Sequence, residues 1–321
     1  MSDILREVDR VSILTLQDNY VDVLAMDGND VIERPFLVKN PTKAGATLSL
    51  SPVAEHGFST FITVVADEQE RSMLFDFGCS PHGAAFNADL LSVDLTRVEA
   101  LALSHGHMDH FGGMKQLVER TNRSDLELVA HPGVFKESRF VKTPTGYQLI
   151  FPTLARADVE ALGVSVVESE VPRQVLDGNA LFLGEIPRNC DFERGMPNAF
   201  QKNDGEESFD TIEDDSSMVF HLRGKGLVIL SGCAHAGIVN TVNHAREVTG
   251  VEEVHAIMGG FHLTGPDFAH AVEPTIEAFQ ALSPQHVVPA HCTGRAATLA
   301  IEKAMPDAFI LNMSGTTLNF A

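Results

Sequence analysis

The stretch LSHGHMDHFGG, residues 103–113, places four metal-ligating side chains within six residues: His105, His107, Asp109 and His110. Imidazole and carboxylate groups are ligands that suit zinc, manganese or iron. Because alternate side chains of an extended segment share a face, His105 and His107 can bind one ion together. Asp109 and His110 follow one turn later and can reach a second ion. Protonated histidines crowded in this way would repel one another, so the pattern predicts a two-metal site.

The elements around this stretch predict a strand-to-helix junction. Residues 98–103 (VEALAL) have the composition of a buried strand, and MKQLVER after Gly113 has apolar residues at helical spacing. Gly106 permits a close approach of the backbone to a metal, while Gly112 and Gly113 permit the bend into the helix. Loops at such junctions are where α/β proteins commonly place their chemistry.

Four strand-like runs end in a loop that carries a histidine: His105, His235, His262 and His291. If these strands lie side by side, their loops converge at one edge. The expected strands are 61–65, 73–77, 98–103, 251–260, 286–290, 309–311 and 317–320, and a hairpin joins 217–222 to the run from Leu227. The expected helices begin just after Gly113 and near residues 238, 273 and 295.

The middle of the chain, residues 131–216, is less regular and includes the acidic run NDGEESFDTIEDD. We predict that it is an insertion or lid on a single domain that spans residues 1–321. His131 at its start, like His56 nearer the N-terminus, lies beside a strand-like run and is expected to be structural.

The metal-ligating stretch matches the HxHxDH signature of the metallo-β-lactamase superfamily. AEHGFSTFI, LFDFGCSP, LVILSGCAHAGIVNT, IMGGFHLTGP and PAHCTG occur in order around it. Together they resemble the subgroup of dihydropterin ribofuranosylaminobenzene phosphate synthases. The resemblance implies an α/β fold, an αββα sandwich, and a site for two divalent metal ions, with zinc the first expectation and manganese or iron the alternatives.

The resemblance also implies ligand roles. His105 and His107 would hold the first ion, Asp109 and His110 the second, and His291 would complete the second site. Many members of the superfamily carry a bridging aspartate at the end of a late hairpin, where this chain has Cys233. They also carry a histidine before that hairpin, where this chain has EDDSS. The usual ligand set is therefore incomplete.

His235 is the preferred replacement, because an imidazole fills the vacancy without adding charge. Cys233 is a weaker candidate ligand, and we predict that it is an apolar support packed beneath the site. Asp215, or its neighbour Asp214, is a further candidate for the place of the missing histidine. A solvated acidic loop is the simpler interpretation of these two carboxylates.

Catalytic roles follow from this arrangement. Asp109 would bind metal and orient the nucleophile, while a protonated His262, or His235 if it is not a ligand, would assist the leaving group. Arg188 and Arg194 are candidate contacts for an anionic substrate, with solvated surface arginines as the alternative.

Composition narrows the class of function. The 23 basic and 44 acidic residues give a net charge of −21, which disfavours nucleic acid and anionic membranes as partners. A small anionic substrate remains compatible, because a bound metal reverses the local sign of charge. The charged N-terminus, the lack of a long apolar run and four cysteines without CxxC spacing predict a cytoplasmic protein, and an oligomer is compatible.

The leading hypothesis is a dinuclear metal-dependent hydrolase that acts on a small anionic ester, such as a phosphoester or phosphodiester. The alternative is a synthase (transferase) that condenses phosphate-bearing pterin substrates, as the subgroup name implies. A flavin-coupled di-iron protein is disfavoured, since those relatives carry glutamate where this chain has His107. A metal-binding sensor without catalysis is the fourth hypothesis.

Overall fold

Two large sheets face each other in the computed structural model, which describes residues 4–35, 38–42, 45–203 and 205–321. The first sheet has eight strands. Their order is β12 (Ser165–Glu168), β9 (Glu127–Ala130), β8 (Val98–Ala102), β7 (Gln69–Phe77), β6 (Ser59–Ala66), β2 (Arg10–Gln17), β21 (Thr317–Phe320) and β3 (Ile32–Glu33).

The second sheet has seven strands and carries three parallel neighbours at one end. Its order is β13 (Arg173–Val175), β14 (Ala180–Phe182), β17 (Ser217–Leu222), β18 (Gly226–Ser231), β19 (Val254–Gly260) and β20 (His286–Ala290), with β1 (Glu7–Val8) beside β17.

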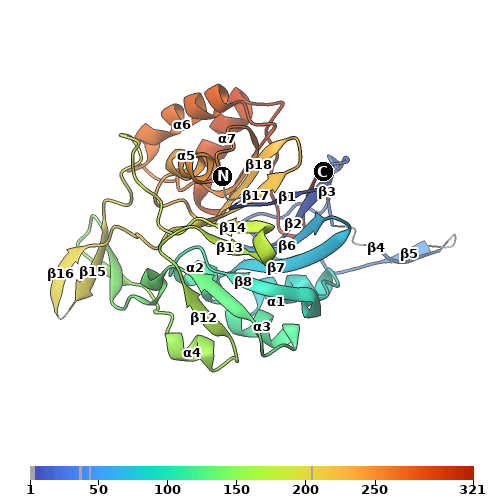
Figure 1. Cartoon of the computed structure of the whole chain (residues 1–321), viewed down its shortest axis with the longest axis horizontal. Coiled ribbons are helices and arrows are strands. Elements are labelled where there is room, and N and C mark those ends of the chain that lie inside the picture. The colour runs from blue at the N-terminus through green and yellow to red at the C-terminus, as the bar shows by residue number, and fades with distance from the viewer. Residues whose placement is uncertain (1–3, 36–37, 43–44, 204) are drawn as a thin grey trace.

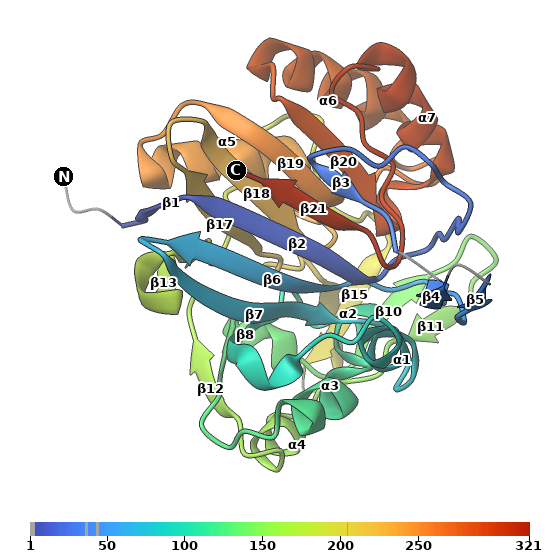
Figure 2. The same cartoon turned by 90° about the vertical axis from the view of Figure 1, so that its right-hand side faces the viewer.

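Helices cover the outer face of each sheet, which makes four layers (Figures 1 and 2). The second sheet is covered by α5 (Ile238–Thr249), α6 (Ala269–Leu282) and α7 (Arg295–Ala304). The first is covered by α1 (Gly83–Leu90) and α3 (Met114–Thr121), with α4 (Arg156–Glu160) near its edge. This is the expected αββα sandwich, so the predicted fold class is confirmed.

Three apolar clusters fill the spaces between the layers. One lies between the sheets and includes Phe75 and Phe220, one joins the second sheet to α5–α7, and one joins the first sheet to α1 and α3. Every residue of β18 and β19 is buried, as strands covered on both faces require. Each large side chain buried in this way contributes about 1.5–3 kcal/mol.

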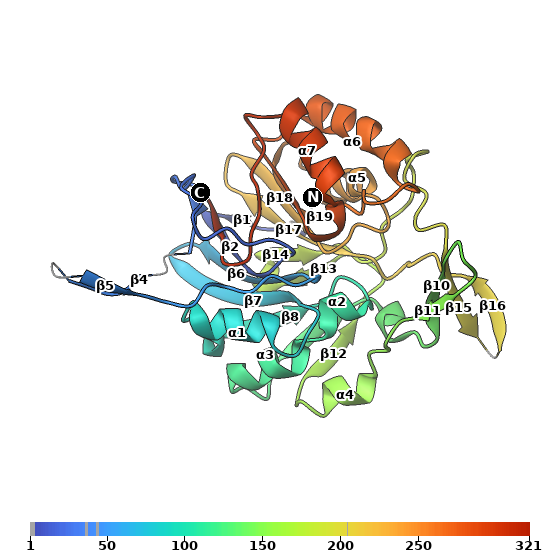
Figure 3. The same cartoon turned by 180° about the vertical axis from the view of Figure 1, so that it is seen from behind.

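Residues 131–216 contribute to several parts of the fold. β12, β13 and β14 belong to the two main sheets, whereas β10 (Arg139–Lys142), β11 (Gln148–Ile150), β15 (Ala199–Asn203) and β16 (Glu206–Phe209) form a separate four-stranded sheet. A second small sheet, the hairpin of β4 (Val38–Thr42) and β5 (Gly45–Leu48), extends away from the body (Figure 3).

Short helical turns complete the chain. They are α2 (Met108–Phe111), η1 (Leu95–Arg97), η2 (Pro132–Phe135), η3 (Leu176–Gly178) and η4 (His291–Thr293). In the described part of the chain, no helix is long and apolar enough to cross a membrane.

Most of the expected elements are confirmed, and one strand is not. The hairpin is β17–β18, and α5 ends at Gly250, whose φ of 71° suits a helix end. The run 309–311 makes only an isolated bridge, between Phe309 and Val287. Its apolar side chains pack beside β20, but its backbone does not form a strand ladder there. The prediction of a strand at 309–311 was therefore wrong.

Candidate metal centre

Histidine-bearing loops from both sheets meet at one edge of the sandwich. β18, β19 and β20 are adjacent and parallel, so the loops with His235, His262 and His291 follow the same ends of neighbouring strands. His105 follows β8, which lies in the facing sheet rather than beside them. The loops converge across the sandwich: the ring centroids of His105 and His235 are 4.8 Å apart, and those of His110 and His291 are 5.0 Å apart.

The first group of converging atoms comes from His105, His107 and His235, whose ligand nitrogens all lie within 4.8 Å of one another. His107 is extended, with φ −92° and ψ 146°, and immediately precedes α2, so it shares a face with His105 as predicted. The side chains are buried, and the Nε2 atoms of all three have no hydrogen-bond partner among the described residues. An unpaired buried polar group costs about 1–3 kcal/mol, and a cation bound by three imidazoles removes that cost.

Burial favours the metal-binding form of these rings. It lowers the pKa of His105 and His235 well below the usual value, and that of His107 to about 4. The rings are therefore neutral at physiological pH, and neutral imidazole is the form that binds zinc, iron or manganese. The residues present fit a divalent metal.

The second group consists of Asp109, His291 and His56. Asp109 Oδ2 lies 3.3 Å from His291 Nε2 and 3.5 Å from His56 Nε2. Burial alone would raise the pKa of Asp109, but the charge of His110 and the contact with His291 outweigh it and hold the pKa well below its usual value. The carboxylate is ionised and able to bind a cation.

His56 corrects an expectation, because the sequence pointed to a structural role. Its side chain is 67% exposed at the metal centre and faces Asp109. The close fit beside it, where a Cβ atom on Gly57 would lie 2.9 Å from Asp109 O, exists only in the folded chain, so the sequence held no signal for this placement. Phe58 N also donates to that carbonyl at 3.1 Å, so the loop before β6 is tied to the histidine stretch. His131 caps η2 through a bond from Gly133 N to its Nδ1, as a structural histidine would.

His110 is held between a carboxylate and a thiol. Its Nδ1 lies 2.6 Å from Asp76 Oδ2 and its Nε2 lies 3.2 Å from Cys233 Sγ. Burial by itself lowers the pKa of His110, but Asp76 and Asp109 outweigh it and raise the pKa to about 9. Asp76 also accepts hydrogen bonds from Ser104 N and Oγ, so it fixes both the strand end and the ring.

Cys233 lies where the groups meet. Its sulfur belongs to a group with His105 and His110, to another with His291 and Cys292, and to a third with His235 and His262. The sequence pointed to an apolar support beneath the site. The structure instead places the thiol within reach of the ligand atoms on both sides.

Two neighbouring carboxylates hold the loops that carry the ligands. Asp214 Oδ2 accepts from Gly106 N at 2.8 Å and from Arg139 Nη1 at 2.9 Å. Burial raises the pKa of Asp214, but Arg139 outweighs it and lowers the pKa to about 2. Asp215 Oδ2 accepts from Ala236 N at 2.9 Å, and burial raises its pKa to about 6. Among the described residues neither aspartate belongs to a group that could hold a metal.

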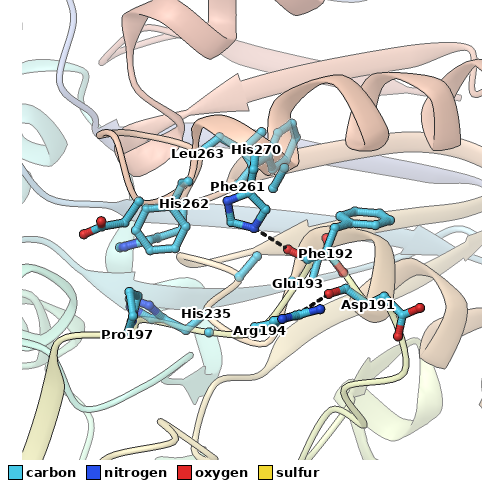
Figure 4. Close-up of a pocket in the computed structure, with 16 residues that line it drawn as sticks. Asp191, Phe192, Glu193, Arg194, Pro197, His235, Phe261, His262, Leu263 and His270 are labelled. Atoms are coloured by element: carbon cyan, nitrogen blue, oxygen red, sulfur yellow. Dashed lines mark hydrogen bonds between the residues drawn. The ribbon is translucent and has the colours of Figure 1, made fainter.

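A cavity of about 530 Å³ opens beside His235 and His262 (Figure 4). Arg194 lines it, with its Nε donating to Asp191 O at 2.6 Å, whereas Arg188 lies outside the lining and donates from Nη2 to Thr211 O at 2.5 Å. The further lining residues are Phe192, Glu193, Gly195, Pro197, Ala234, Gly237, Phe261, Leu263, Asp267, Phe268, His270 and Ala271.

His262 is the histidine best placed between the cavity and the ligands. Its ring centroid lies 4.2 Å from that of His235, and its Nδ1 has no hydrogen-bond partner among the described residues. Burial lowers the pKa of His262, but a hydrogen bond to Cys292 and the negative charge of its thiolate outweigh it and raise the pKa above the usual value. A protonated ring at this place can donate to a group bound in the cavity.

Known proteins resemble this chain in sequence. Residues 56–145 match the family model described as the metallo-beta-lactamase superfamily. The chain is 31% identical, over 79% of its length and 86% of the relative, to the 7,8-dihydropterin-6-methyl-4-(beta-D-ribofuranosyl)-aminobenzene-5'-phosphate synthase of Methanocaldococcus jannaschii.

Solved structures show the same fold. Tm1679, a metal-dependent hydrolase of the beta-lactamase superfamily, superposes with a TM-score of 0.68 at 22% identity, over 97% of this chain and 98% of that one. The metallo-beta-lactamase fold protein YhfI of Bacillus subtilis superposes with a TM-score of 0.50 at 10% identity, over 97% and 100% of the two chains.

Proposed function

The chain belongs to the metallo-beta-lactamase superfamily, and on that premise we propose that it is a dinuclear metal-dependent hydrolase of a small anionic ester, such as a phosphoester or phosphodiester. One observation carries the proposal. Two adjoining groups of metal-ligating atoms, one of them with unpaired buried imidazole nitrogens, lie beside a cavity large enough for a small molecule.

Localisation in the cytoplasm is part of the proposal and is supported by four free cysteines.

The ligand sets follow from the two groups. His105, His107 and His235 of the first group would hold one ion. Asp109 and His291 of the second group would hold the other, joined by His110, which the family resemblance implies as a ligand and whose Nε2 lies 4.0 Å from Asp109 Oδ2. When bound, such a pair of ions supplies a hydroxide nucleophile at neutral pH and neutralises developing negative charge. Zinc is the first expectation for this nitrogen-rich set, with manganese and iron as alternatives.

The chain's own groups would orient and protonate the substrate. Asp109 is ionised and central, so it can direct the attacking group. His262 carries a raised pKa at the wall of the cavity and can donate a proton to the leaving oxygen. Arg194 lines the same cavity and can bind a phosphate oxygen of the substrate.

A second candidate function is a synthase reaction on phosphate-bearing pterin and aminobenzene substrates. It is favoured by the 31% identity to the Methanocaldococcus jannaschii synthase, which extends over 79% of this chain. Bound metal ions would serve either reaction, because both substrate classes carry phosphate groups whose negative charge the ions would neutralise.

Metal content tests the dinuclear site. We expect elemental analysis of protein purified without chelator, and then reloaded with zinc or manganese, to give about two ions per chain. His235→Ala should lose about one of them, because it removes one of the three imidazoles of the first group. A reloaded wild-type ratio well below one would refute the dinuclear proposal.

A substrate screen separates the two functions. Metal-loaded protein would be assayed on phosphomonoesters, phosphodiesters, lactones and thioesters, with His235→Ala as the control for contaminating hydrolases. Hydrolysis of simple phosphoesters supports the hydrolase. Inertness to all of them, with turnover only of a pterin plus an aminobenzene ribotide, supports the synthase.

A further inference from the structure

We infer that His56 is a positioning residue that donates a hydrogen bond to Asp109 rather than a metal ligand, and that Asn19 fixes this role. The inference rests on the proposed function in one respect, namely that Asp109 and His291 bind a metal. It concerns a histidine from the loop before β6, outside the HxHxDH stretch and outside the late histidine loops.

The position of His56 allows two roles. Its Nε2 lies 3.5 Å from Asp109 Oδ2, and its ring centroid lies 4.8 Å from that of His291. If Nε2 carries a lone pair, His56 can be a third ligand beside those two residues. If Nε2 carries a hydrogen, it can only donate to the carboxylate.

The Asn19 side chain decides between the two roles. Asn19 Nδ2 donates to the carbonyl oxygen of His291 at 2.9 Å, and because a carbonyl oxygen only accepts, this contact identifies the nitrogen end of the amide. The same Nδ2 lies 3.2 Å from His56 Nδ1. That imidazole nitrogen must therefore accept, and the hydrogen of the neutral ring is on Nε2, which faces Asp109.

The other end of the amide gives His291 the opposite tautomer. Asn19 Oδ1 lies 3.3 Å from His291 Nδ1 and can only accept, so the hydrogen of His291 is on Nδ1. His291 Nε2 then presents a lone pair 3.3 Å from Asp109 Oδ2, as a metal ligand requires. One amide thus makes His291 a ligand and His56 a donor.

Asn19 is itself held in place. Its backbone N–H donates to Asp18 Oδ1 at 2.7 Å, and the same carboxylate oxygen accepts from His291 N at 2.8 Å. His56 is 67% exposed, and its Nε2 lies 3.5 Å from Asp109 Oδ2, at the outer limit of a hydrogen bond. A carboxylate oxygen has two lone pairs, so Asp109 Oδ2 can accept from His56 and still face His291.

The first test measures metal binding in matched variants. His56→Ala removes the donor, His56→Gln restores an N–H at a similar reach, and His82→Ala removes another exposed histidine, at the start of α1. We expect His56→Ala to bind as many ions as the wild type at saturation, but to hold the weaker ion roughly 10–100-fold less tightly in a chelator competition. His56→Gln should recover most of that loss, and His82→Ala should match the wild type.

Three outcomes overturn the inference. Loss of one ion at saturation in His56→Ala would make His56 a ligand. Unchanged affinity in His56→Ala would remove its role, and a defect in His56→Gln as large as in His56→Ala would exclude hydrogen-bond donation. A wild-type protein that binds fewer than two ions would instead count against the proposed function.

The second test is independent of metal and of activity. Nitrogen NMR of the imidazole rings in metal-free protein, above the pKa of His56, should show a bare Nδ1 and a protonated Nε2. Asn19→Ala should abolish that preference. The opposite tautomer of His56 in the wild type would refute the inference even if two ions bind.

Discussion

The carboxylate of Asp214 links a buried ion pair to the loop that carries His105 and His107, so Asp214→Asn should weaken both the fold and the proposed metal site. Asp214 is fully buried, pairs with both terminal nitrogens of Arg139 and accepts from Gly106 N. Asparagine keeps the shape of the side chain but removes its charge. Arg139 then retains one carboxylate, that of Asp210, 3.0 Å from its Nε.

The size of the loss follows from the pKa. Arg139 lowers the pKa of Asp214 from its ordinary 3.8 to about 2 against the effect of burial, which corresponds to a stabilisation of about 2 kcal/mol at neutral pH. Breaking a buried ion pair costs about 3–5 kcal/mol when one charge is left alone. Because Asp210 still compensates Arg139, we expect Asp214→Asn to lower the free energy of unfolding by about 2–4 kcal/mol.

The loss should depend on pH with a defined sign. Since the folded pKa is lowered, the stabilisation by Asp214 is complete above its unfolded pKa of about 3.8 and disappears as the pH falls towards about 2. The difference in unfolding free energy between wild type and Asp214→Asn should therefore shrink over that range. Urea unfolding of metal-free protein, followed by circular dichroism at several pH values, measures it.

Asp210→Asn is the matched control, because Asp210 also pairs with Arg139 but accepts from Ile212 N, whereas Gly106 N donates to Asp214. Both variants should lose stability, but only Asp214→Asn should loosen the loop that holds His105 and His107. We expect its metal affinity to fall by roughly 10–100-fold, and that of Asp210→Asn to stay near the wild type. Equal metal affinities in the two variants would refute this reasoning, as would a stability of Asp214→Asn equal to that of the wild type at pH 7.

Three further predictions concern other parts of the site. Asp109→Ala should abolish turnover while the protein stays folded, as judged by its circular dichroism spectrum; near-normal activity on any substrate found would contradict its role. Burial raises the pKa of Glu193 to about 7, so the wild type should lose up to roughly 3 kcal/mol of unfolding free energy as the pH rises from 4.5 to 7. Glu193→Gln should remove that pH dependence, and a variant with the pH profile of the wild type would contradict this role of Glu193. Gly112→Ala should lower the free energy of unfolding by about 1–3 kcal/mol, because the added Cβ would lie 1.7 Å from Cys79 O. Thermal or urea unfolding measures this, and a midpoint equal to that of the wild type would show that the two loops separate easily.

Local patterns in the sequence predicted the elements that carry the site, because strand periodicity and glycine placement are local properties. The strand β2 (RVSILTLQ) was not predicted as part of the fold. It pairs with β6 and with the C-terminal strand β21, and such a distant partner has no local signature. The residues around Phe309 in the sequence are apolar, as in a strand, yet Phe309 makes only a single bridge. It is partly buried by the packing of its side chain and not by strand pairing.

His56 was missed for the same reason. Its role comes from contacts with Asn19 and Asp109, which are 37 and 53 positions away in the chain. A lone histidine beside a strand has many structural uses, so its type and local spacing carry no signal for the site. The tight fit of Gly57 against Asp109 O becomes visible only when both loops are in place.

The departure from the usual ligand pattern also has a physical explanation in the structure. Where the resemblance leads one to expect a histidine before the hairpin, this chain has Asp214 and Asp215. The first carboxylate holds Gly106 N, between two ligands of the first group, and the second holds Ala236 N, next to His235. Both loops are thus fixed from the position where a ligand would otherwise stand. The third imidazole of the first group, that of His235, comes from the loop after β18 instead. Three imidazole nitrogens thus lie within 4.8 Å of one another although no histidine precedes the hairpin.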